Sequence, residues 1–184
     1  MDEREKYERM HKVPDYSPGP GAAHAGAFMA CYLKGGETVI DFGCGTGDAA
    51  LLMYEKGHDV YLVDIASNCL RDSVRREIGS RFFVSALHEL PEDLPARDWG
   101  FCSDVMEHLP PEWVAPSLAA MRSKVRNCFF AISGHPDAWG RHIGEVLHLS
   151  VHPRPWWVRE IGRHWQTVEE INESNSTYLL VGRS

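Results

Sequence analysis

The chain has 184 residues, of which 43% are hydrophobic and 24% charged, and its net charge at neutral pH is -7. These values are typical of a globular protein, and the length suits one domain. The acidic balance argues against a nucleic-acid partner, because a surface that binds nucleic acid needs clustered basic side chains. No apolar run reaches the roughly 20 residues that span a bilayer, so we expect no membrane partner.

The amino terminus and the cysteines indicate a cytoplasmic location. The opening sequence "MDEREKYERM" is charged and lacks the apolar core of an export signal. The five cysteines show no C-x-x-C pair and no zinc-ligand spacing, so we expect neither a disulfide framework nor a metal site. The sequence is compatible with an oligomer as well as with a monomer.

Alternating helical and strand-like periods predict an α/β fold. A charged amino-terminal helix is followed by "PDYSPGPG", Pro14–Gly21, and then by the small-residue helix "AAHAGAFMACYL". Strands are predicted at Thr38–Phe42, Asp59–Val63, Arg81–Val84, Gly100–Ser103, Cys128–Ile132 and Thr177–Val181. Further helices are predicted at Gly47–Lys56, Ser67–Ile78 and Pro111–Val125. Apolar strands alternating with helices imply a parallel sheet covered on both faces, and "HWQTVEEINESNSTYLLVGRS" predicts an antiparallel hairpin at its edge.

The stretch "VIDFGCGTG" places a glycine-rich turn between the first strand and a helix. Glycines let the backbone turn sharply and approach a ligand, and the helix that follows offers free N–H groups. Asp64 ends the next strand, 17 residues after Gly47. A carboxylate there can accept both ribose hydroxyls of an adenosine, so the pattern predicts a nucleoside-containing cofactor.

Two features argue that this cofactor is not a dinucleotide. The dinucleotide signature is G-x-G-x-x-G, and here the third glycine, Gly47, comes one residue too early. Asp41 at the end of the first strand would repel a pyrophosphate but would attract a sulfonium or an α-ammonium group. The cofactor should therefore carry positive charge near this loop.

Three segments in register resemble the class I S-adenosylmethionine-dependent methyltransferases. They are "VIDFGCGTG", the acid Asp64, and "FCSDVMEHLPPEW" (Phe101–Trp113), which is similar to the D-V-L-E-H segment of small-molecule members. The resemblance covers about residues 36–132. It implies a Rossmann-like doubly wound sheet of about seven mostly parallel strands, with an antiparallel carboxy-terminal hairpin strand. It also implies S-adenosylmethionine as the cofactor and S-adenosylhomocysteine as its product.

The resemblance assigns a part of the cofactor to each matching position. The methionine part would lie against the loop and the fourth strand, at Asp41, Gly43, Cys44, Gly45, Gly47, Ser103 and Asp104. The ribose and adenine would lie against Asp64 and Ile65. The acid that the family often places at the adenine amino group is missing here. We expect backbone contacts from Ala86 and Leu87 instead, or the hydroxyl of Ser85.

The acceptor side is predicted from residues outside these motifs. His108 follows the fourth strand and could act as a general base with Glu107 beside it, or the two could only shape the loop. Substrate contacts are expected from Tyr16, His24, His148 and His152. His148 and His152 could ligate a metal on one helix face, but "LHLSVHP" alternates like an extended segment, which favours a position beside the acceptor.

We therefore expect one methyltransferase domain over residues 1–184, with a cap or lid at 1–35, a cofactor-binding core at 36–132 and an acceptor-side segment at 133–184. The expected reaction is methyl transfer to an oxygen or nitrogen of a small molecule. Alternatives are an enzyme acting on a nucleic acid or nucleotide, and a non-catalytic S-adenosylmethionine-binding protein. The (Asp/Asn)-Pro-Pro-aromatic motif of amino-methylating DNA enzymes does not follow the fourth strand, which disfavours the first alternative.

Overall fold

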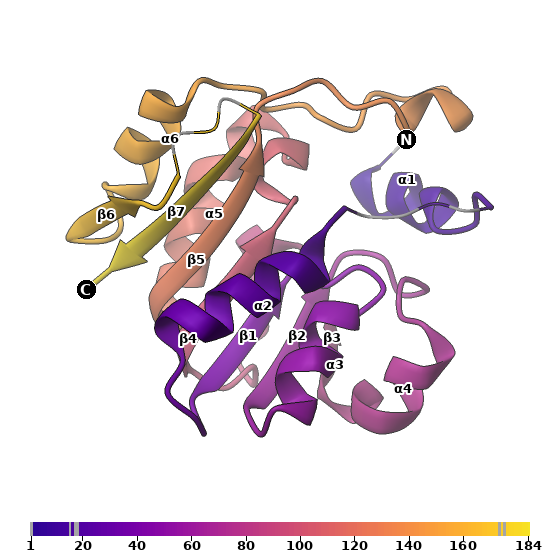
Figure 1. The fold of residues 1–184 in the computed structure, drawn as a ribbon. Coiled ribbons are helices and arrows are strands. Elements are labelled where there is room, and N and C mark those ends of the chain that lie inside the picture. The colour runs from indigo at the N-terminus through magenta and orange to yellow at the C-terminus, as the bar shows by residue number, and fades with distance from the viewer. Residues whose placement is uncertain (1, 15, 17–18, 173, 175) are drawn as a thin grey trace.

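The computed structural model of the chain describes residues 2–14, 16, 19–172, 174 and 176–184. The Pro14–Gly21 stretch and the polar turn at 172–176 therefore lie partly outside the described residues. The described part forms a seven-stranded sheet with the order β3-β2-β1-β4-β5-β7-β6 (Figure 1). The strands are β1 (Thr38–Phe42), β2 (Asp59–Asp64), β3 (Phe82–Val84), β4 (Arg97–Ser103), β5 (Val125–Ser133), β6 (Thr167–Glu170) and β7 (Thr177–Arg183).

The strand pairing confirms the predicted fold class. The strands β3, β2, β1, β4 and β5 run parallel, while β7 pairs antiparallel with both β5 and β6. The chain order reverses at β1, which lies between β2 and β4. Open α/β sheets bind ligands at the carboxyl ends of the strands beside such a reversal.

Helices cover both faces of the sheet, as Figure 1 shows for α2 and α3 on one face and α5 on the other. The helices are α1 (Glu3–Met10), α2 (Gly21–Tyr32), α3 (Asp48–Glu55), α4 (Asp72–Ile78), α5 (Pro111–Lys124) and α6 (Arg154–Ile161). Short 3-10 turns are η1 (Gly79–Arg81), η2 (Leu87–Glu89), η3 (Met106–His108) and η4 (Gly140–His142). Phe28 of α2 is buried in one core and Trp157 of α6 in the other. Within the described residues, no helix has the length and apolar character that crossing a bilayer requires.

Helix α4 begins at Asp72, later than the predicted start at Ser67. The residues before it are held by other partners. Ser67 donates its hydroxyl to Glu8 Oε1 at 2.8 Å, and Arg71 N–H donates to Thr46 O at 3.1 Å. The segment is therefore tied to α1 and to the glycine-rich turn instead of forming a first helical turn.

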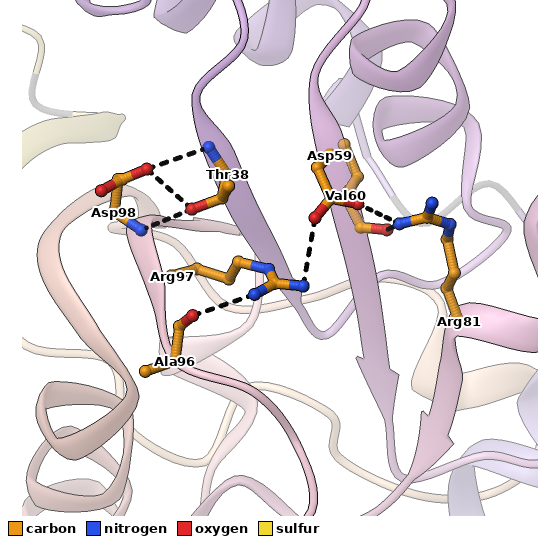
Figure 2. A network of polar contacts seen from close by, with 7 residues as sticks. All are labelled: Thr38, Asp59, Val60, Arg81, Ala96, Arg97 and Asp98. Atoms are coloured by element: carbon orange, nitrogen blue, oxygen red, sulfur yellow. Dashed lines mark hydrogen bonds and ion pairs between the residues drawn. The ribbon is translucent and has the colours of Figure 1, made fainter.

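The amino ends of β1, β2 and β4 are joined by a polar network (Figure 2). Thr38 Oγ1 donates to Asp98 Oδ2 at 2.7 Å, and Asp98 N–H donates back to Thr38 Oγ1 at 3.0 Å. Asp59 accepts ion pairs from Arg81 and, at 3.1 Å, from Arg97. These contacts extend β4 back to Arg97 and fix the strand register at the end opposite the glycine-rich turn.

Candidate active site

The glycine-rich turn after β1 passes directly under the connection that follows β4. The N–H groups of Gly43 and Cys44 both donate to Val63 O, at 2.8 and 3.0 Å. Gly43 has a φ of +72°, and a Cβ built there would lie 2.3 Å from Val105 Cγ2. Both the backbone conformation and the close approach therefore require glycine at this position.

Asp64 at the end of β2 is held by backbone N–H groups on both carboxylate oxygens. Gly45 N–H donates to Oδ2 and Ala66 N–H donates to Oδ1, each at 2.9 Å. Burial raises the pKa of Asp64, and these two hydrogen bonds oppose that rise. A carboxylate has about four lone-pair sites, so Asp64 can still accept from a ligand hydroxyl, as ribose recognition requires.

A cavity of about 220 Å³ lies at the carboxyl ends of the parallel strands, between the glycine-rich turn, β4 and α1. Most of the predicted cofactor residues line it, namely Asp41, Gly43, Cys44, Gly45, Asp64, Ile65, Ala86, Leu87, Ser103 and Asp104. Gly47 is not among the lining residues. Its φ is +80°, and a Cβ there would lie 2.6 Å from Val74 Cγ1, so it lets α3 and α4 pack closely. The contacts of these residues with a cofactor stay predictions.

Acidic side chains dominate the charge of this cavity. Among the described residues, its lining contains five carboxyl groups, those of Glu3, Asp41, Asp48, Asp64 and Asp104. The lining also contains one guanidinium, that of Arg71, which already pairs with Asp48 at 3.2 Å. Burial, and then the charge of Asp64, raise the pKa of Asp41 to about 8. Asp41 Oδ2 has no hydrogen-bond partner among the described residues, so a cationic ligand would stabilise its ionised form.

A second polar cluster joins the end of β4 to α2. Ser103 Oγ donates to Asp104 Oδ2 at 2.8 Å and lies 2.7 Å from His24 Nδ1. His24 Nδ1 is also 3.6 Å from Asp104 Oδ2. Asp104 has a φ of 55°, a conformation that few non-glycine residues adopt. His24 thus lies beside the cavity lining and holds two residues that belong to it.

His108 and Glu107, the two predicted catalytic residues, have different surroundings. His108 lines the cavity, and its Nδ1 lies 2.8 Å from the Tyr7 hydroxyl oxygen. Desolvation lowers the pKa of His108 to about 3, so the ring is neutral and weakly basic. Glu107 is fully buried outside the lining, where its Oε1 accepts from Ser133 N–H at 2.9 Å and burial raises its pKa to about 8. A general-base role for His108 stays a prediction, and this neutral ring suits hydrogen bonding or ligation better.

The remaining predicted acceptor residues are not all in one place. Tyr16 lines the cavity and makes an edge contact with Trp139, with ring centroids 5.6 Å apart. His148 is outside the lining, and its ring lies 4.5 Å from that of His108. His152 is also outside it and stacks on Trp156, with centroids 3.8 Å apart. Residues 145–153 form neither helix nor strand, which agrees with the predicted non-helical segment.

The predicted site omitted several lining residues. Tyr7 reaches the cavity from α1, His11 from the position directly after that helix, and Trp113 from α5. Tyr7 and His11 are four residues apart, a spacing that places them on one face of a helix and could have indicated them. Ser85 also lines the cavity, but its Oγ donates to Glu89 O at 2.8 Å. The backbone of Ala86 and Leu87 is therefore the better candidate for adenine contacts.

Residues 39–127, which include the glycine-rich turn, Asp64 and the D-V-M-E-H segment, match a family model described as a methyltransferase domain. This segment of the chain is similar to a methyltransferase domain. Together with the shared fold, the match confirms the resemblance to class I S-adenosylmethionine-dependent methyltransferases that the sequence motifs indicated. No curated protein matches the chain significantly in sequence.

Solved structures share the fold of this chain at low sequence identity. Magnesium protoporphyrin IX methyltransferase from Synechocystis PCC 6803, with bound SAH, is 16% identical with a TM-score of 0.68, covering 98% of this chain and 94% of its own. The PH0226 protein from Pyrococcus horikoshii OT3 is 18% identical with a TM-score of 0.71, and the match covers 96% of this chain and 98% of that protein's chain. The Burkholderia thailandensis 1,6-didemethyltoxoflavin-N1-methyltransferase, bound to 1,6-didemethyltoxoflavin and S-adenosylhomocysteine, is 17% identical with a TM-score of 0.68, covering 100% and 91%.

Proposed function

We propose that this protein transfers a methyl group from S-adenosylmethionine to an oxygen or nitrogen atom of a small-molecule acceptor and releases S-adenosylhomocysteine. One observation carries this proposal: an acid-lined cavity lies over a glycine-rich turn at the reversal of the sheet. Structures with this fold include enzymes named for a porphyrin and for a toxoflavin precursor, which supports a small-molecule acceptor.

In this proposal each group around the cavity recognises one part of the cofactor. The carboxylate of Asp64, oriented by Gly45 and Ala66, accepts the ribose hydroxyls. Asp41 and Asp104 offer negative charge to the cationic methionine end. A dinucleotide would bring its own negative charge to the same carboxylates, so the excess of acids disfavours it.

The reaction is an in-line displacement at the methyl carbon. A lone pair on the acceptor atom forms the new bond to carbon while the carbon–sulfur bond breaks, and the electrons of that bond neutralise the sulfonium. The proton that the acceptor atom carried passes to water. Because the leaving group is good, the chain contributes mainly by orienting the two reactants. Residues above the cavity that can orient the acceptor are Tyr16, His108 and Trp113.

The proposal extends to the organisation of the chain and to its surroundings. We assign the cofactor core to residues 36–132 and the acceptor side to residues 1–35 and 133–184 of one domain. Tyr7 and Tyr16 of the first segment line the cavity, which supports the assignment of that segment. We also propose a reducing, cytoplasmic location, since all five cysteines are free thiols.

Calorimetry with S-adenosylmethionine and with NAD tests the cofactor. We expect binding of the first only, and we expect Asp64→Ala to weaken it by roughly 10- to 100-fold, because hydrogen bonds to a charged group contribute about 1.5–3 kcal/mol. The matched control is Asp72→Ala, which removes an acid at the start of α4 outside the cavity lining. Full affinity in Asp64→Ala, or tighter binding of NAD, would refute the proposed cofactor site.

A methyl-donor assay over a library of hydroxyl- and amine-bearing metabolites tests the reaction itself. An enzyme should release S-adenosylhomocysteine only when a suitable acceptor is present. Cofactor binding without turnover on any acceptor would instead support the non-catalytic alternative.

A further inference from the structure

Three side chains that offer metal-ligand atoms converge beside the acceptor end of the cavity. One ligand atom from each of Glu107, His108 and His148 lies within 4.8 Å of the other two. Glu107 and His108 belong to η3, and His148 comes from the irregular segment after η4. We infer that these three residues bind one divalent transition-metal ion. This site can be tested by itself, while its role in catalysis rests on the proposed methyl transfer.

Glu107 supplies an oxygen that the fold leaves unsatisfied. Its Oε1 accepts from Ser133 N–H at 2.9 Å, which fixes the carboxyl group at the end of β5. Its Oε2 is buried and finds no hydrogen-bond partner within the described part of the chain. A buried polar oxygen without a partner is costly, and a metal ion would provide the missing interaction.

Each histidine is held by an oxygen at Nδ1. The Tyr7 hydroxyl oxygen lies 2.8 Å from His108 Nδ1, and it can in turn donate to Leu147 O at 3.5 Å. His148 Nδ1 hydrogen-bonds to the carbonyl oxygen of His135. Metal-ligating histidines commonly donate one ring N–H to such an oxygen, which leaves the other nitrogen free for the metal. The same arrangement here assigns Nε2 of both rings to the ion.

The spacing of the ligand atoms is close to what a metal ion needs. Zinc lies about 2.0–2.2 Å from nitrogen and oxygen ligands, so two such ligands are at most about 4.4 Å apart. The ligand atoms of the three residues lie within 4.8 Å of one another. Side-chain shifts of less than about 1 Å would bring them to the separation that a bound ion requires. The rings of His108 and His148 already meet edge-on, with an interplanar angle of 80°.

The donor set selects the class of metal. One carboxylate oxygen and two imidazole nitrogens suit zinc, cobalt, iron or manganese, whereas Mg²⁺ and Ca²⁺ prefer oxygen ligands alone. Three protein ligands also leave a coordination position open. Because His108 lines the cavity, the ion would lie beside the proposed acceptor.

An ion at this place would favour an oxygen acceptor. A hydroxyl group bound to it loses its proton to water at a lower pH, because the ion stabilises the resulting anion. The oxygen lone pair then forms the bond to the methyl carbon, and the electrons of the breaking carbon–sulfur bond pass to sulfur. The class of substrate that follows is an alcohol or phenol able to reach the ion.

Metal binding by the full-length chain tests the site without a methyl acceptor. After chelation and buffer exchange, Zn²⁺ and Co²⁺ are titrated separately and followed by calorimetry, with metal content measured after gel filtration. We expect one ion per chain, not displaced by excess Mg²⁺. Removing an outer-shell partner of a metal ligand lowers metal affinity by about 10- to 100-fold. Because Glu107 and His148 would be direct ligands, Glu107→Gln and His148→Gln should each lower the affinity by at least about 100-fold.

The matched control is His152→Gln, which removes a nearby histidine that stacks on Trp156 and is not part of the cluster. It should keep the affinity of the wild type. Glu107→Gln retains an oxygen for Ser133, and His148→Gln provides a second variant whose folding is checked by thermal unfolding. No binding of either ion, or an equal loss in His152→Gln, would overturn the inference. S-adenosylmethionine binding would then still support the proposed function, since that measurement requires no metal.

Discussion

At the scale of single residues, the site depends on glycines whose two constraints can be separated. Gly43 and Gly36 both have positive φ angles, +72° and +78°. A Cβ at Gly43 would meet Val105, whereas a Cβ at Gly36 would have no atom within 4 Å in the described structure. The pair therefore distinguishes backbone strain from steric overlap.

We predict that Gly36→Ala lowers the free energy of unfolding by about 1–2 kcal/mol, the cost of left-handed backbone. Gly43→Ala should lose a further 1–3 kcal/mol, roughly, from overpacking against Val105. Urea unfolding measures both. Adding Val105→Ala to Gly43→Ala should recover part of the loss, and a double variant no more stable than Gly43→Ala would show that the overlap is not the cause.

At the scale of elements, α1 contributes to the cavity lining and contacts the cavity rim through side chains. Glu8 accepts from the Ser67 hydroxyl at 2.8 Å, and Glu8 O accepts from Asn68 Nδ2 at 3.0 Å. Tyr7 on the same helix reaches His108. These side-chain contacts tie α1 to the rim of the cavity. The helix is therefore suited to open and close independently of the sheet.

We predict that Glu8→Ala speeds amide hydrogen exchange in α1 several-fold and increases the dissociation rate of S-adenosylhomocysteine. The substitution removes the acceptor for Ser67 while it leaves the core intact. Exchange of the amides in α3 serves as the internal control, because α3 packs on the sheet. Equal acceleration in α1 and α3 would indicate global destabilisation instead of local opening.

At the scale of the whole molecule, the sequence predicted those parts of the fold and the site that depend on short, continuous segments. The order of β1, the glycine-rich turn and β2, with Asp64 at its end, follows from local periodicity and from glycine conformation. The cluster of Glu107, His108 and His148 does not, because it depends on how residues 134–153 fold back. Asp137 organises that segment by accepting from Gly140 N–H at 2.7 Å and Leu147 N–H at 2.8 Å. No periodicity in the sequence indicates which N–H groups one such carboxylate will select.

Asp41 should make the whole molecule less stable as pH rises towards 8, while His108, whose pKa is lowered to about 3, offsets that loss below about pH 6.5. The pKa of Asp41 is raised to about 8 in the folded chain, from an unfolded value near 4, so the folded chain retains a proton that the unfolded chain releases. The contribution of Asp41 to stability is therefore lost between about pH 4 and pH 8 and is constant above that range. The side chain in Asp41→Asn stays neutral at every pH, so the unfolding free energy of the variant should fall less steeply with pH than that of the wild type. The two slopes should differ by up to about 1.4 kcal/mol per pH unit. Glu107, with a pKa of about 8, contributes in the same direction and leaves part of the slope in the variant. Urea unfolding from pH 5.5 to 8.5 compares the two slopes, and identical slopes would mean that Asp41 is already ionised in the folded chain.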